Sequence, residues 1–232
     1  TGSTFAALFG ALRDGGLPIG RVLLLTFTDW SAGAAIQAIS DLAPDLRVGA
    51  FSLLRGRWTW ERDPAAALPS VPGWAGHSGI AAWEPDHIDD PLRRAPRLGL
   101  RPNQEVGVSQ LIGRLGPPKP GEPVLVIGTG EHVWGPMLLA EGLEQAGADV
   151  RLVATTRSPI LEGDVVRHKV TFPDHFGVGV PMYLHNVPAR PDARVILMTE
   201  TGANGVCPEL RSHLGRGQIV DGDGLVTEFG AT

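Results

Sequence analysis

Two short polar segments carry the residue types that bind phosphate. The first is Gly128-Thr129-Gly130-Glu131, and the second is Thr155-Thr156-Arg157-Ser158. Backbone amides in a glycine turn can donate hydrogen bonds to an anion, and hydroxyls with a guanidinium can add charge-assisted contacts. The two segments together predict an anion site, for which phosphate is the best match because arginine fits its geometry. The alternative is structural: the threonines satisfy a strand end and Arg157 forms a salt bridge.

Each polar segment directly follows a run that is typical of a buried parallel strand. Val124–Ile127 and Val150–Ala154 are short, apolar and rich in β-branched residues. The residues between them predict a helix that starts at Pro136 and ends at Gly147. In a β-α-β unit, ligands bind beyond the carboxyl ends of the strands. The two polar segments are therefore expected to face the same crevice.

The glycine turn does not fit a dinucleotide site. The fingerprint requires a third glycine where this chain has Val133, and an acidic residue after the second strand, where it has Thr155. NAD is therefore not expected, and an S-adenosylmethionine site stays open as a weaker alternative. Glu131 is the best carboxylate candidate for acid–base catalysis because it lies in this turn. The scattered histidines, such as His175, are expected to be structural, and no spacing predicts a metal site.

The first residues form a second candidate anion site. Thr1-Gly2-Ser3-Thr4 precedes an amphipathic helix, and free amides at a helix N-terminus can bind a phosphate. The alternative is that a serine or threonine only caps the helix. Next, Arg21–Thr28 predicts a buried strand, Ser31 caps a helix, and Val48–Leu54 predicts a further strand.

The alternation of helices and strands predicts an α/β fold with two Rossmann-like parts and mostly parallel sheets. The first part is residues 1–62, the second is residues 97–232, and a proline-rich irregular connector at 63–96 joins them. Further expected elements are an edge strand at Trp58–Trp60, a helix from Asn103 to Leu115, strands at Val165–Phe172 and Arg194–Thr199, a helix at Pro208–Leu214, and a closing hairpin within Ile219–Phe229.

Composition narrows the class of protein. A net charge of −5 over 232 residues argues against a nucleic-acid partner, because such proteins usually carry a basic face. The lone Cys207 rules out an intrachain disulfide and fits a reducing compartment, so a cytoplasmic location is expected. No apolar run approaches the roughly 20 residues that span a bilayer, so no membrane partner is expected.

Several motifs resemble known families. The chain contains GTGE at 128–131, TTRSP at 155–159 and FPDHFGVGVPMYLHN at 172–186. These resemble the TRSP domain, which lies C-terminal to a phosphoribosyltransferase domain in bacterial tellurite-resistance-type stress operons. TGST at 1–4 is similar to the end of the phosphoribosyl-pyrophosphate loop of type I phosphoribosyltransferases, and TFTDW at 26–30 resembles the strand that follows in this subfamily.

The resemblance implies that residues 1–62 are the C-terminal part of a phosphoribosyltransferase core and residues 97–232 a TRSP domain. Thr1, Gly2, Ser3 and Thr4 would hold the 5′-phosphate of phosphoribosyl pyrophosphate. The acidic pair that precedes this motif in the family, and the ligands of the implied Mg²⁺, are expected in a missing N-terminal transferase half. This chain alone is therefore expected to lack transferase activity, and to act only within a longer or complemented protein.

The resemblance also implies a role in making or modifying a nucleotide-like metabolite during a stress response. It does not imply a reaction for the TRSP domain itself. The alternative is a non-catalytic ligand-binding or scaffolding domain that regulates the transferase. A pocket with only anion ligands would favour binding, whereas a positioned carboxylate or imidazole would favour catalysis.

Overall fold

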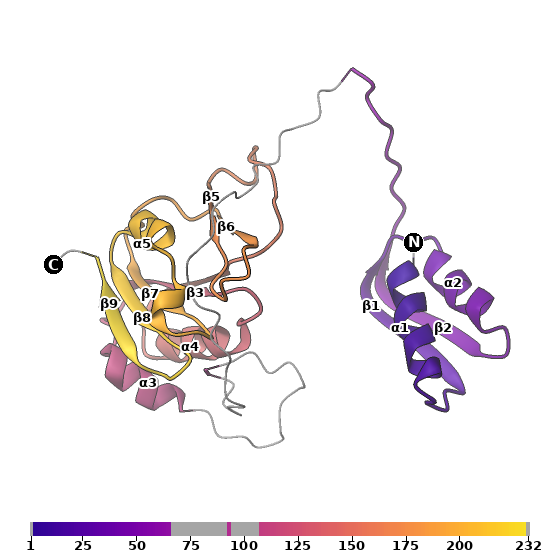
Figure 1. The fold of residues 1–232 in the computed structure, drawn as a ribbon, viewed down its shortest axis with the longest axis horizontal. Coiled ribbons are helices and arrows are strands. Elements are labelled where there is room, and N and C mark those ends of the chain that lie inside the picture. The colour runs from indigo at the N-terminus through magenta and orange to yellow at the C-terminus, as the bar shows by residue number, and fades with distance from the viewer. Residues whose placement is uncertain (1, 66–91, 94–106, 231–232) are drawn as a thin grey trace. The chain divides into compact units, whose positions relative to one another are not determined.

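The computed structural model describes residues 2–65, 92–93 and 107–230 (Figure 1). The chain divides into two units, Thr1–Ala67 and Leu68–Thr232. Most of the expected connector, together with Thr1 and the expected start of a helix at Asn103, lies outside the described residues.

The first unit contains two parallel strands with two helices on one face. In chain order its elements are α1 (Ser3–Asp14), β1 (Arg21–Asp29), α2 (Ala34–Leu42) and β2 (Arg47–Arg55). The register of β1 and β2 places Leu24 opposite Ala50. Phe9 and Ile39, from the two helices, are buried against Leu24. The predicted succession of helix, strand, helix and strand is confirmed.

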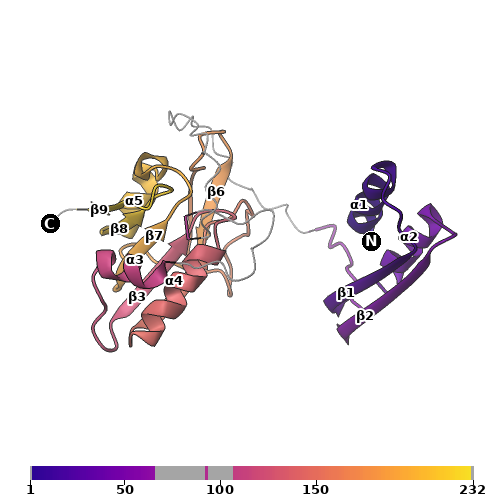
Figure 2. The same cartoon turned by 90° about the horizontal axis from the view of Figure 1, so that it is seen from below.

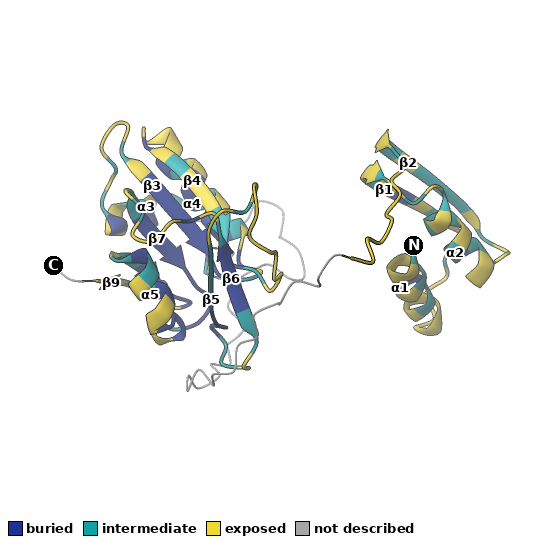
Figure 3. Cartoon of the chain, turned by 90° about the horizontal axis from the view of Figure 1, so that it is seen from above, coloured by how far each residue is buried: buried dark blue, intermediate teal, exposed yellow. Residues whose placement is uncertain are grey.

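The other face of this small sheet is apolar and exposed. We call it the apolar sheet face, and it consists of Leu23, Leu25, Phe27, Phe51 and Leu53. Figure 3 colours many residues of β1 and β2 as exposed. Phe27 is 83% exposed, whereas Leu24, which lies in the same strand but on the opposite face, is 9% exposed. Alternate side chains of a strand point to opposite faces, and only one face is covered within the described residues. The prediction of a buried strand at 21–28 is therefore wrong for half of its side chains, and Trp58–Trp60 forms no strand.

Both helices of the first unit begin at glycines. Gly2, with φ of +81°, and Gly33, with φ of +90°, are the N-cap residues and make no side-chain capping bond. A Cβ atom on Gly2 would lie 2.4 Å from the Cα atom of Ala35, so the approach of α1 to α2 requires glycine. The predicted serine and threonine caps are therefore wrong. Ser31 instead donates hydrogen bonds to the Asp29 carboxylate, from its amide at 2.8 Å and its hydroxyl at 2.7 Å.

The second unit is built on a five-stranded sheet with the order β4-β3-β7-β8-β9. Figure 2 labels four of these strands, β3, β7, β8 and β9. Strands β4, β3, β7 and β8 are parallel, and β9 is antiparallel to β8. A separate antiparallel hairpin is formed by β5 and β6. The fold is thus mixed α/β with a mostly parallel sheet, as expected. Its elements are α3 (Val108–Leu115), β3 (Pro123–Gly128), α4 (Trp134–Gln145), β4 (Asp149–Ala154), β5 (Lys169–Pro173), β6 (Pro181–His185), β7 (Arg194–Met198), the 3-10 helix η1 (Ala203–Gly205), α5 (Pro208–Leu214), β8 (Gly217–Val220) and β9 (Val226–Phe229).

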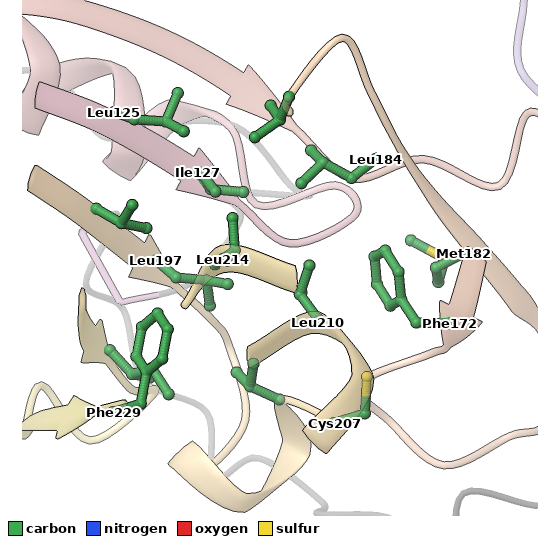
Figure 4. Packing of buried hydrophobic residues seen from close by; sticks show 14 residues of the cluster. Leu125, Ile127, Phe172, Met182, Leu184, Leu197, Cys207, Leu210, Leu214 and Phe229 are labelled. Carbon is green, nitrogen blue, oxygen red and sulfur yellow. The ribbon is translucent and has the colours of Figure 1, made fainter. Parts of the chain in front are cut away.

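Two hydrophobic cores hold this sheet, one on each face. On one face, Leu139 of α4 packs with Val126 and Ile196 of the central strands, and α3 contributes to the same core. On the other face, Leu210 of α5 and the β5–β6 hairpin pack against Leu197 (Figure 4). Because both faces are covered, the central strands are nearly continuous apolar runs, which is why their prediction from sequence succeeded.

The predicted strands at 124–127, 150–154 and 194–199, the helix at 208–214 and the closing hairpin are confirmed. Helix α4 begins at Trp134, two residues earlier than expected, and the chain leaves it through Gly147 with φ of +101°. The strand predicted to begin at Val165 begins at Lys169, and β6 was not predicted. None of the described helices is long and apolar enough to cross a membrane.

Candidate anion-binding pocket

Backbone pairing continues past the carboxyl ends of the central strands. The amide of Thr129 donates to the carbonyl of Met198 at 3.1 Å, and the amide of Thr155 donates to the carbonyl of Gly128 at 2.9 Å. These bonds fix the backbone where the two polar segments begin. Strand β4, which follows β3 in the chain, pairs with one edge of β3, whereas β7 pairs with the other edge. Ligands of open α/β sheets bind beside such a reversal of strand order.

A pocket of about 540 Å³ lies at this edge of the sheet. This volume falls within the range of roughly 300–1,000 Å³ that is usual for small-molecule sites. Three segments form its lining: the turn after β3, the end of β4, and the β5–β6 loop with the start of β6. The lining residues are Gly130, Glu131, Thr155, Thr156, Arg157, Asp174, His175, Phe176, Val178, Val180 and Met182.

Three of the eight residues predicted for this site do not line the pocket. Gly128 and Thr129 are buried at the strand end, and Ser158 is exposed. The amide of Ser158 donates to the hydroxyl oxygen of Thr156 at 3.1 Å, so this serine closes a local turn. The structure brings the other five together around the pocket: Gly130, Glu131, Thr155, Thr156 and Arg157.

The expectation of a row of free amides in the glycine turn is wrong. The amide of Thr129 is bonded to Met198, and the amide of Gly130 donates to Thr155 Oγ1 at 2.8 Å. Within the described part of the chain, the amide of Glu131 donates no hydrogen bond. One amide of the turn, rather than three, is thus available to a ligand.

Arg157 is exposed and lines the pocket. Its guanidinium makes no hydrogen bond or ion pair with any described residue, so the alternative of a structural salt bridge gains no support among them. The neighbouring backbone is held firmly, because Thr156 and Tyr183 exchange backbone hydrogen bonds of 2.9 and 2.8 Å. A fixed backbone therefore presents a cation that is available to an anion in the pocket.

The carboxylate of Asp174 organises the β5–β6 loop. Asp174 is 4% exposed, and its two oxygens accept hydrogen bonds of 2.9–3.1 Å from four backbone amides between Phe176 and Val180. Such a charge-assisted network rigidifies the loop that it closes. The loop carries His175 and Phe176, whose ring centroids lie 4.2 Å apart.

His175 lies against the glycine turn and is 8% exposed. A Cβ atom on Gly130 would lie 3.2 Å from His175 Cε1, and Gly130 has φ of +59°. Both features favour glycine there.

Sequence reasoning missed Asp174 and His175 as pocket residues. The signal was their place in the FPDHFGVGVPMYLHN motif, but no spacing connected that motif with the two polar segments.

Comparison with known families places this pocket in context. Residues 95–209 match the family model described as "TRSP domain C terminus to PRTase_2". The chain contains a TRSP domain. The match includes every residue that lines the pocket, and the description puts the domain in the context expected from the sequence, C-terminal to a phosphoribosyltransferase-type domain. No curated protein and no solved structure matches the chain.

Other polar side chains of the second unit are buried along the same edge of the sheet. Thr199, Glu200 and Thr201 follow β7, and Asp221 follows β8. The hydroxyls of Thr199 and Thr201 lie 3.0 Å apart, and Asp221 accepts two amides of the β8–β9 turn. None of these residues lines the pocket. We therefore assign the bonded groups among them to the structure of the strand ends.

No group of three or more His, Cys, Asp or Glu side chains among the described residues could hold a metal ion. The Mg²⁺ that the resemblance implies stays a prediction, because this ion is often held by only one or two carboxylates together with substrate phosphates.

A larger hollow of about 720 Å³ lies at the opposite edge of the five-stranded sheet. Three basic residues line it, namely Lys119, Arg194 and Arg216. Arg194 is already engaged, because it donates to the carbonyls of Leu115 and Gly116 at the end of α3 and to Gln218 Oε1. A guanidinium at a helix C-terminus stabilises the last carbonyls. The hollow lies at the first residues of β3, β7 and β8, whereas ligands of such sheets bind beyond the carboxyl ends of the strands. It is therefore the weaker candidate despite its size.

Part of the TGST segment, residues 2–4, lies in the first unit near a smaller hollow of about 200 Å³. Gly2 lines it, whereas Ser3 and Thr4 are exposed in the first turn of α1. The carboxylate of Asp29 lines it too, and hydrogen bonds from Ser31 lower the pKa of this carboxyl. A negative charge at this hollow disfavours a phosphate unless a further cation is supplied.

Proposed function

We propose that the TRSP domain binds a phosphorylated small molecule in the pocket at the ends of β3 and β4. The observation that carries this proposal is the guanidinium of Arg157, which has no partner among the described residues and lines the pocket beside the hydroxyls of Thr155 and Thr156. The unbonded amide of Glu131 adds a neutral donor. Donors of these kinds, at the carboxyl edge of a parallel sheet, suit phosphate oxygens.

The pocket also contains groups that could act in acid–base catalysis. Glu131 brings a carboxylate and His175 an imidazole to the lining. These are the side chains that most often transfer protons in enzymes. Their presence favours a ligand that is chemically modified over a purely scaffolding role.

We infer that the domain serves a phosphoribosyltransferase that makes or modifies a nucleotide-like metabolite. The support is the family description, which sets the TRSP domain C-terminal to PRTase_2. The first unit would then belong to a Rossmann-like transferase core, and the rest of that core would cover the apolar sheet face. Five large apolar side chains exposed together are typical of an interface.

The binding proposal is tested by titrating the isotope-labelled 232-residue chain with inorganic phosphate and following backbone amide signals by NMR. We expect the signals of Glu131 and of residues 155–157 to shift together and to saturate. Shifts that never saturate, or that occur only elsewhere on the molecule, would overturn the proposal.

The transferase-interface proposal is tested with Phe27→Glu, which places a charge on the apolar sheet face. We expect weaker binding of a hydrophobic dye and less aggregation of the isolated chain. The matched control is Val165→Glu, because Val165 is 84% exposed but lies in the second unit. An equal effect of both substitutions would count against an interface at this face.

A further inference from the structure

We propose that the ligand of the TRSP pocket is a phosphate ester that joins a flat aromatic ring to a hydroxyl-bearing spacer, which is the chemistry of a nucleoside monophosphate. This inference rests on the proposed phosphate site and adds the substrate class. It follows from the uneven chemistry of the lining. The donors come from the ends of β3 and β4, whereas the β5–β6 loop and the start of β6 contribute Phe176, Val178, Val180 and Met182.

The size and polarity of the pocket exclude inorganic phosphate as its full occupant. A phosphate ion would fill only a small part of 540 Å³. Of the six lining residues on the β5–β6 side, Asp174 and His175 are polar, whereas Phe176, Val178, Val180 and Met182 are apolar. Hydroxyl groups placed against these four side chains would lose hydrogen bonds to water without replacement. A sugar phosphate alone therefore fits poorly, whereas a flat ring would bury apolar surface there.

Phe176 and His175 supply a platform for such a ring. Their ring centroids are 4.2 Å apart and their planes are inclined by 38°. Phe176 is partly exposed toward the pocket, and the bonds to Asp174 hold its loop in place before any ligand arrives. A platform that is already ordered binds without the entropic cost of ordering a loop. Aromatic side chains recognise bases by stacking in this way.

Glu131 is the residue that would bind the hydroxyl-bearing spacer of the ligand. Its carboxylate lines the pocket together with Arg157 and would repel a phosphate placed next to it. A carboxylate accepts hydrogen bonds from neighbouring hydroxyls, as acidic residues do for the ribose of dinucleotides. The opposite charges of Glu131 and Arg157 thus orient the ligand, with its phosphate at the guanidinium and its hydroxyls at the carboxylate.

The test measures the affinity of the whole chain for adenosine, guanosine, cytidine and uridine monophosphates, ribose 5-phosphate and inorganic phosphate by calorimetry. We expect at least one nucleoside monophosphate to bind roughly tenfold or more tightly than ribose 5-phosphate, since stacking on one side chain is worth about this factor. Phe176→Ala should remove that advantage and leave the affinity for ribose 5-phosphate unchanged. Phe176→Leu keeps the apolar volume if the alanine variant does not fold, and it should remove most of the advantage.

The outcomes distinguish the assignment of an aromatic ring from the proposed phosphate site on which it rests. If ribose 5-phosphate binds as tightly as every nucleotide, or if the Phe176 substitutions weaken all ligands equally, the ring assignment is wrong while the phosphate site stands. If Arg157→Ala leaves the binding of every ligand unchanged, the phosphate site itself is wrong. Glu131→Gln should weaken ribose 5-phosphate and the nucleotides, but not inorganic phosphate.

Discussion

The hydroxyl oxygen of Thr155, after β4, accepts a hydrogen bond from the amide of Gly130, after β3, and the two atoms lie 2.8 Å apart. This bond joins the two segments that the sequence predicts to converge. It also engages the amide of Gly130, which the sequence predicts to face the ligand. The pocket is therefore built by contacts between its own parts, and Arg157 is the cation left for an anion.

Removing this bond should expose the Gly130 amide to exchange. Thr155 is 3% exposed, so Thr155→Val leaves a donor without its partner, at a cost of about 1–2 kcal/mol. We expect hydrogen exchange of the Gly130 amide to become at least about tenfold faster in this variant. Thr155→Ser keeps the acceptor and should stay close to the wild type. Unchanged exchange in Thr155→Val would show that the bond does not protect this turn.

Asp174 should be the most sensitive position of the β5–β6 loop. Asp174→Ala deprives four backbone amides of their acceptor and should destabilise the TRSP domain by about 3 kcal/mol or more. Asp174→Asn keeps one acceptor oxygen, so its stability should lie between those of the wild type and Asp174→Ala. Urea unfolding followed by NMR signals of the TRSP domain provides the measurement. The matched control is Asp164→Ala, because Asp164 is exposed and its carboxylate has no described partner. Equal losses at both positions would contradict the role given to Asp174.

The β3-α4-β4 unit was predictable because its signals are local. Val124–Ile127 is buried on both faces and reads as a continuous apolar run, and Gly147 marks the end of the helix. The convergence of residues 128–131 and 155–158 followed from topology alone, since parallel strands bring their carboxyl ends to one edge.

The β5–β6 side of the pocket was not predictable in the same way. Strands β5 and β6 contain Pro173 and Pro181, which weaken a strand signal. The loop between them is held by the side chain of Asp174 rather than by a turn sequence. The contact of His175 with Gly130 joins residues 45 positions apart, so no periodicity could reveal it.

In the first unit, the misjudged burial has a different cause. Arg21–Thr28 has the composition of a strand covered on both faces, yet the described residues cover one face only. Composition reports the environment that a strand requires, and not whether this part of the chain supplies it.

Cys207 should react slowly with thiol reagents in the folded protein. Its side chain is 2% exposed and packs in the core near Leu210 (Figure 4). Burial raises the pKa of its thiol to about 11, so very little reactive thiolate exists at neutral pH. We expect iodoacetamide to label the chain fully only in denaturant, as followed by intact mass. Equal labelling rates with and without denaturant would contradict this environment.

His185 should make the TRSP domain less stable in acid. Burial lowers the pKa of His185 below its ordinary value of 6.5, and the charge of Lys169, its partner across the hairpin, acts in the same direction. The unfolded chain therefore takes up this proton first, and stability falls as the pH drops from 6.5 through the lower folded-state pKa. His185→Gln should lessen the pH dependence of urea unfolding in this window, and Lys169→Met should lessen it partly. A pH profile identical to the wild type in His185→Gln would exclude this contribution.

The most direct test of the phosphate site is the affinity of Arg157 variants for ribose 5-phosphate, measured by calorimetry beside the melting temperature. Because Arg157 is exposed, we expect Arg157→Ala to weaken binding about tenfold, the lower end of what a charge-assisted contact contributes, with no change in melting temperature. Arg157→Lys should restore part of the affinity, since lysine keeps the charge but not the planar fork. An Arg157→Ala variant that melts at a lower temperature but binds ribose 5-phosphate as well as the wild type would contradict the account, and would make TRSP a structural motif.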